Sequence, residues 1–125
     1  MIGVTVPNAE IFRTHLERFT QGNIDGAAEL LADDFSFTGP ILQSIGKAEF
    51  LSGSASAAAI ARGCEIHRQW AEGSSVCSFY DFKVETPAGA GVIPMAEWSE
   101  IKDGKLVSSR LIFDTADMAA LMPQA

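Results

Sequence analysis

The chain has 125 residues, the length of one domain, and its 47% hydrophobic and 20% charged residues are the balance of a folded globular protein. Nine Lys and Arg against sixteen Asp and Glu give a net charge of −7, which argues against nucleic-acid partners and anionic membrane surfaces. The longest uncharged stretch, 50–61, is too short for a membrane span, and the first residues show no secretory signal. We therefore expect a single cytoplasmic domain over residues 1–125.

The first half of the sequence predicts three helices and one short strand. Apolar residues recur at the spacing of amphipathic helices, and Gly or acidic residues end each run. Asn8 is the expected N-cap of the first helix, whose apolar stripe includes Phe12, Leu16 and Phe19. The expected elements are a helix from residue 8 to about 22, a short helix over 24–31 ended by Asp33-Asp34, a strand over 35–37, and a helix over 46–60 closed by Gly63.

The second half predicts a four-strand meander. Strand-like runs are separated by turn residues, and Asp103-Gly104 between two such runs is a strong hairpin signal. The expected strands cover 64–71, 76–86, 92–102 and 105–113. Helices followed by these strands predict the α+β class, with three helices packed on one face of a curved antiparallel sheet.

The first hairpin of the meander determines which side chains share a face. A four-residue loop pairs Trp70 with Cys77 and leaves Cys64 and Cys77 roughly 20 Å apart along the ladder, too far for a disulfide. Both thiols are therefore expected to be free, as in a reducing compartment. The face with more large apolar groups near the hairpin is predicted to be the inner one. It carries Ile66, Arg68, Trp70, Cys77, Phe79 and Asp81, which leaves His67, Tyr80 and Phe82 on the outer face.

Three segments carry a family resemblance: GNIDGAAELLADDFSFTGP at 22–40, the helix start Gly46-x-x-x-Phe50-Leu51, and DGKLVSSRLIFD at 103–114. They resemble the SnoaL-like members of the nuclear transport factor 2-like superfamily, which includes ketosteroid isomerases, limonene epoxide hydrolases and polyketide cyclases. The resemblance implies a cone-shaped fold around a deep, mostly apolar pocket, and a homodimer formed through the sheet.

The resemblance also places the catalytic positions of those relatives on this sequence, and most of them differ. Gly39 stands where the isomerases carry their base aspartate, His15 falls on their helix-1 tyrosine, and Glu97 lies near their second acid. Where the epoxide hydrolases have Arg-x-Asp, this chain reads Phe79-Tyr80-Asp81, so that only Asp81 remains of their triad. Neither known mechanism can operate unchanged.

Two titratable side chains are candidates for catalysis from their neighbours alone. His15 lies on the apolar stripe of the first helix and points inward or to the pocket rim. It is either a core residue or a base or hydrogen-bond donor that works near neutral pH. Asp81 lies among apolar neighbours and is either a general acid or base, or the ion-pair partner of Arg68.

A third candidate, Glu97, depends on the Asp103-Gly104 turn. A tight two-residue turn sets Glu97 opposite Arg110 on the surface, whereas a three-residue turn with a bulge sets it opposite Ser109 in the pocket. The residues leave both registers open, and the family resemblance favours the pocket.

The remaining residues of interest are predicted to cap a helix or to line the pocket, and none is predicted to bind a metal. Asp114 suits the N-cap of a short helix that starts at Thr115. Two histidines on separate elements, without Cys or carboxylate at ligand spacing, argue against a metal site. The core and the pocket wall are one surface in this architecture, so the predicted ligand-binding residues are Phe12, Phe19, Phe37, Trp70, Phe79, Leu111 and Phe113.

Two functions follow as alternatives. The first is a cofactor-free acid–base enzyme of isomerase, cyclase or hydrolase type that acts on a small apolar or cyclic molecule, with His15, Asp81 and Glu97 as catalytic residues. The second is a non-catalytic ligand-binding or dimerising accessory module, which the missing acid at Gly39 favours. A binding module returns its ligand unchanged, whereas an enzyme releases an altered molecule.

Overall fold

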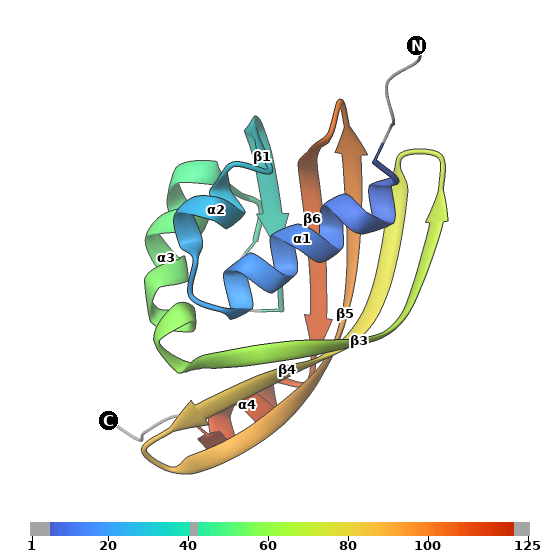
Figure 1. Cartoon of the computed structure of the whole chain (residues 1–125). Helices are drawn as coiled ribbons and strands as arrows, with labels where there is room; N and C mark the ends of the chain where they lie inside the picture. The colour runs from blue at the N-terminus through green and yellow to red at the C-terminus, as the bar shows by residue number, and fades with distance from the viewer. Residues whose placement is uncertain (1–5, 41–42, 122–125) are drawn as a thin grey trace.

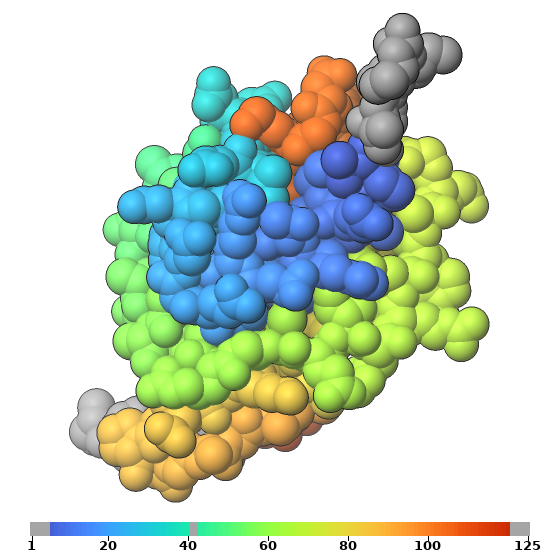
Figure 2. All heavy atoms as spheres, viewed as in Figure 1, coloured from blue at the N-terminus to red at the C-terminus, as the bar shows by residue number. Residues whose placement is uncertain are grey.

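A computed structural model describes residues 6–40 and 43–121 of the chain. In chain order its elements are α1 (Asn8–Thr20), α2 (Ile24–Ala28), β1 (Leu31–Thr38), β2 (Ile45–Gly46), α3 (Lys47–Ile60), β3 (Ala61–Glu72), β4 (Ser75–Thr86), β5 (Gly89–Lys102), β6 (Lys105–Phe113) and α4 (Thr115–Leu121). The first three helices lie on one side of a strongly curved sheet (Figure 1). Seen from that side, their atoms cover part of the sheet, while β3 and the hairpin between β4 and β5 remain visible (Figure 2). The α+β architecture is the predicted one.

The sheet has the strand order β2-β1-β6-β5-β4-β3. The strands β3 to β6 form the predicted antiparallel meander. β1 pairs with β6 in parallel, so the sheet is mixed and not wholly antiparallel as predicted. The chain between β1 and β6 contains α3 and the rest of the meander, and only such a long connection allows two neighbouring strands to run in the same direction.

The ends of the helices differ from the prediction in three places. Asn8 is not the N-cap of α1 but lies inside the helix, which follows Pro7, and its side-chain amide donates to the carbonyl of Gly73. α2 ends at Ala28 and not at residue 31. Leu31 is the first residue of β1, and its side chain packs in the core. Gly63 does not close α3, which ends at Ile60, but lies within β3.

The first hairpin has the predicted register at its loop but the opposite faces near that loop and along β4. A register shift between Ile66 and Arg68 places Ile66 against the core, as predicted. Trp70 pairs with Cys77 as expected, yet Trp70 and Phe79 are each 48% exposed. Tyr80 and Phe82, predicted to face outward, are buried on the inner face. Along the whole of β4 the even-numbered residues are buried, because the odd-numbered row ends in the charged residues 81, 83 and 85, which remain in contact with water.

The last hairpin has the tight turn, one of the two geometries that the sequence leaves open, but Glu97 has neither of the two partners predicted for it. Lys102 pairs with Lys105 across a tight turn, in which Asp103 and Gly104 both have positive φ, as a type I′ turn requires. The register then shifts between Glu100 and Ile101, which leaves one extra residue on β6. As a result Glu97 lies opposite Leu111, and its side chain faces inward.

The core lies between α1 and the inner face of the sheet. Its fully buried side chains come from both layers: Phe12, Leu31, Phe35, Val76, Ile93, Ile101 and Leu106.

Asp114 accepts a hydrogen bond from the amide of Ala116 and so caps α4, as predicted, and both cysteines are free. No helix in the described part of the chain is long and apolar enough to cross a membrane.

Phe35→Ala should lower the free energy of unfolding by about 3–5 kcal/mol, because it removes a buried ring and leaves a cavity in the core. The ring of Phe35 is 2% exposed and lies 5.3 Å from that of Phe50, centroid to centroid. Val92→Ala, on the outer face, is the control and should stay within about 0.5 kcal/mol. Urea unfolding of the two variants measures both values, and equal losses would contradict the assigned faces.

Candidate functional site

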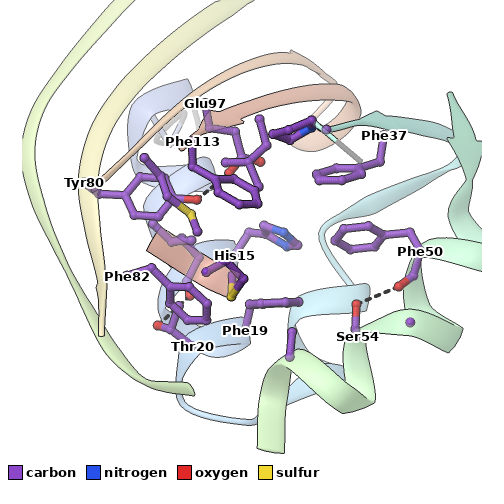
Figure 3. A pocket seen from close by; sticks show the side chains of 18 of the residues that line it. His15, Phe19, Thr20, Phe37, Phe50, Ser54, Tyr80, Phe82, Glu97 and Phe113 are labelled. Atoms are coloured by element: carbon purple, nitrogen blue, oxygen red, sulfur yellow. Dashed lines mark hydrogen bonds between the residues drawn. The ribbon is translucent and has the colours of Figure 1, made fainter. Parts of the chain in front are cut away.

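A cavity of about 370 Å³ lies between the helices and the inner face of the sheet (Figure 3). This volume is in the range of pockets that hold small organic molecules. Its walls come from α1, α3, α4 and all the strands except β3, and they are almost wholly apolar. Five phenylalanine rings supply much of the surface: Phe19, Phe37, Phe50, Phe82 and Phe113.

The structure brings together only some of the predicted ligand-binding residues. Phe19, Phe37, Leu111 and Phe113 line the cavity, together with His15 and Glu97. Phe12 does not reach it, because its ring is fully buried in the core. Trp70 and Phe79 were placed wrongly, since they lie on the outer face, where their rings contact each other edge to face.

Asp81 also lies on the outer face, and the prediction that it faces inward is wrong. Its Oδ2 atom is 2.8 Å from Nε2 of His67, and this contact is the main reason why the pKa of His67 is raised. The predicted partner Arg68 instead places its guanidinium over the ring of Trp70. Asp81 therefore does not share a space with the other two candidates.

Glu97 reaches the cavity from β5 and is 7% exposed. The hydroxyl of Tyr80, on β4, donates to its Oε1 at 2.8 Å, and the Ser109 hydroxyl, on β6, also bonds to it. Burial disfavours the charged carboxylate and raises the pKa of Glu97 to about 7, although both hydrogen bonds act in the opposite direction. The carboxyl group can therefore hold or release a proton near neutral pH.

His15 enters the cavity wall from α1 and is buried. Its Nδ1 is 3.0 Å from the carbonyl oxygen of Ala27, which can only accept, so Nδ1 carries the proton and donates it. Burial lowers the pKa of His15, the charge of Arg18 adds to this effect, and the Ala27 hydrogen bond opposes it. Among the described residues Nε2 has no hydrogen-bond partner, so it is the basic nitrogen left for a ligand.

Glu97 and His15 are the two buried groups in this cavity that are suited to proton transfer at neutral pH, whereas Glu49 of α3 also lines the cavity but is exposed. Figure 3 shows both side chains directed into the same space, with Tyr80 beside Glu97. The hydroxyls of Thr20 and Ser54 donate to carbonyls of their own helices. In residues 6–40 and 43–121, no three His, Cys, Asp or Glu side chains lie close enough to hold a metal ion.

Tyr80, Phe82 and Phe50 are parts of the site that the sequence analysis did not predict. A usable signal was present for the first two, since β4 alternates over its whole length between an apolar row and a row that ends in charges. Phe50 is the centre of an aromatic cluster with rings from α1 and β1, a contact between distant segments that no local pattern encodes.

Glu97→Gln should change how stability depends on pH. The pKa of Glu97 is about 7 in the folded protein against 4.5 for the free side chain, so the folded state binds more protons between these values. Burying the charged form of Glu97 lowers the free energy of unfolding. This loss is absent below pH 4.5, grows between pH 4.5 and 7, and reaches roughly 3 kcal/mol above pH 7.

In urea unfolding, Glu97→Gln should therefore be more stable than the wild type at pH 8 and should lose this advantage at pH 4. Glu72→Gln, an exposed carboxyl at the end of β3, is the matched control and should differ little from the wild type at both pH values. A pH-independent effect of Glu97→Gln would contradict the raised pKa.

The fold agrees with that of three solved structures, all of low sequence identity. A LEH-like epoxide hydrolase from M. tuberculosis is 18% identical, with a TM-score of 0.78 over 91% of this chain and 88% of that one. IdmH from Streptomyces antibioticus, a proposed polyketide cyclase, is 16% identical, with a TM-score of 0.79 over 93% and 98%. A protein of ketosteroid isomerase-like fold from Catenulispora acidiphila, in complex with trimethylamine, is 18% identical, with a TM-score of 0.78 over 94% and 93%.

These likenesses establish a shared fold. A comparison with curated proteins gave no match. The model of the SnoaL-like domain matches residues 12–109, which contain His15, Tyr80, Glu97 and most of the cavity wall. The chain therefore belongs to the SnoaL-like domain family.

Proposed function

We propose that this chain is an acid–base enzyme of isomerase, cyclase or hydrolase type, with Glu97 and His15 as its catalytic residues. Its substrate is a small, mostly apolar molecule held in the cavity. The observation that carries the proposal is a buried carboxyl with a pKa of about 7 facing the same apolar cavity as an uncharged imidazole. Asp81 has no part in this reaction because it lies on the outer face.

The two groups have complementary roles. Protonated Glu97 donates its proton to an oxygen of the bound molecule, while Nε2 of His15 accepts a proton from a carbon atom or from an attacking water. The Tyr80 hydroxyl, whose pKa is raised by burial and by Glu97, keeps its proton and stabilises the carboxylate that forms. Return of one proton from His15 to Glu97, through product or water, restores both groups, and no cofactor enters the cycle.

The walls of the cavity support an uncharged substrate. Among its described lining residues there is no Lys or Arg, so a carboxylate or phosphate would find no counter-charge. The aromatic rings and the limited volume favour a compact cyclic molecule. The similar folds of an epoxide hydrolase and of a proposed polyketide cyclase support the same reaction types. The free thiols of Cys64 and Cys77 fit the reducing cytoplasm as the place of the reaction.

Glu97→Gln and His15→Gln should each lower turnover by about 10²–10⁴-fold, the usual effect of removing a positioned proton carrier. The measurement is mass spectrometry after incubation in D2O with a panel of cyclic ketones and epoxides. Deuterium incorporation reports proton transfer at carbon, and a mass gain by one water reports hydrolysis.

Asp81→Asn is the matched control for these variants, because it removes a carboxylate from the other face of the same sheet. It should retain wild-type turnover. Equal conversion by the wild type and by Glu97→Gln would exclude Glu97 as the proton carrier.

A second candidate function is a non-catalytic ligand-binding module. Gly39 favours it: this residue lines the cavity where related isomerases carry a base aspartate, and it supplies no acid there. Such a module would bind a member of the same panel, as seen by ligand-observed NMR, and return it without deuterium or added water.

We also propose that the chain forms a homodimer through the outer face of its sheet. Large apolar side chains are exposed on four adjacent strands of this face: Trp70, Phe79, Trp98 and Ile112. The strand pairings place them close together, since Phe79 lies opposite Ala96, which in turn lies opposite Ile112. Contiguous exposed apolar side chains of this kind are typical of protein interfaces.

Phe79→Glu should convert a dimer into a monomer, because it buries a charge without a partner in the middle of the proposed interface. Analytical ultracentrifugation measures the mass, and circular dichroism verifies the fold. Val6→Glu is the control, since Val6 is equally exposed but precedes α1 and belongs to no strand of the sheet. A wild-type chain that stays monomeric at high concentration would contradict the proposal.

A further inference from the structure

The short helix α2 ends against the catalytic imidazole. The carbonyl of Ala27, in its last turn, accepts both Nδ1–H of His15 at 3.0 Å and the amide of Leu30 at 3.2 Å. A carbonyl oxygen has two lone pairs, so both of its acceptor sites are occupied and its direction is fixed. The neutral ring of His15 can make this contact only with its proton on Nδ1. The orientation of one peptide in α2 therefore decides which ring nitrogen remains basic.

α2 cannot hold that peptide in place by itself. It has five residues, and isolated helices of this length are unstable in water. Asn23 caps its start, since its Oδ1 accepts the amide of Gly26 at 2.9 Å. Arg18, one turn after His15 on α1, donates Nη1 to the carbonyl of Gly26 at 2.9 Å, directly before Ala27. The same Nη1 lies 3.5 Å from Oε2 of Glu29, just after the helix.

The packing inside this turn leaves little room for another arrangement. A Cβ atom on Gly26 would lie 2.4 Å from Nδ2 of Asn23 and 2.8 Å from its Cγ, which is closer than non-bonded atoms come. Glycine is therefore needed for the Asn23 side chain to reach its capping position. The cap, the Arg18 bond and the Ala27 carbonyl form one continuous set of contacts that ends at His15.

We propose that Arg18 and Asn23 are positioning residues, which hold His15 through α2 as its Nδ1–H tautomer and leave Nε2 as the nitrogen presented to the cavity. The inference rests on the proposed function only for the use of Nε2 in catalysis. The tautomer itself can be measured without any substrate.

The test is ¹⁵N NMR of the imidazole nitrogens at pH 8. The sequence has two histidines, so in a His67→Gln background His15 gives the only ring signals. The parent protein should show a protonated Nδ1 and an unprotonated Nε2. Arg18→Met and Asn23→Ala should shift the signals to a mixture of both tautomers, because the Ala27 carbonyl is no longer held against the ring.

Two matched variants separate positioning from general stability. Asn23→Asp keeps the capping oxygen and should keep the Nδ1–H tautomer. Arg13→Met removes an exposed arginine from the same helix, and it should leave the His15 spectrum unchanged. If Arg18→Met fails to fold, the comparison of Asn23→Ala with Asn23→Asp decides the question.

An Nε2–H tautomer in the parent protein would overturn the inference, and so would a pure Nδ1–H tautomer in both Arg18→Met and Asn23→Ala. These outcomes do not depend on turnover. A lack of any reaction in D2O with an intact Nδ1–H signature would reject the proposed enzyme but leave the positioning role of α2 standing.

Discussion

The burial of one carboxyl group is the constraint on which the site depends. Moving a carboxylate out of water into an apolar cavity is costly, and hydrogen-bond donors must offset part of that cost. The donors to Glu97 are the hydroxyls of Tyr80 and Ser109, which come from the strands on either side of β5. The strands β4, β5 and β6 must therefore all be in register for Glu97 to be buried with both of its hydrogen bonds. The pairing of β4, β5 and β6 is as much a part of the site as the side chains that it aligns.

The sequence predicts the order of the elements because each depends on local periodicity and turn chemistry. The hairpin at Asp103-Gly104, the cap at Asp114 and the four strands of the meander are examples. The inner face was predicted wrongly because the reasoning relied on Trp70 and Phe79 near the hairpin. Large apolar groups are often exposed, whereas charged groups are rarely buried. The charged residues further along β4 were therefore the better guide to the outer face.

The site was predictable where it depends on a single element and unpredictable where it depends on contacts between elements. His15 follows from the apolar stripe of α1, and its inward position is confirmed. The partners of the site are separated from it in sequence: Tyr80 is seventeen residues from Glu97, and Ala27 is twelve from His15. Such contacts arise only when strands and helices pack, so no local pattern encodes them. Glu97 was predictable as a residue of β5, but its inward orientation was not, because that orientation depends on an irregularity in β6.

That irregularity has a consequence for comparing this chain with distant relatives. The register shift in β6 leaves one residue, Val107, without a partner on β5, so every position after it changes the face on which it lies. A gap-free alignment between a chain with this extra residue and one without it would match inward side chains to outward ones along the rest of the strand. Residues would then be equated that share a column in the alignment but lie on opposite faces of the sheet.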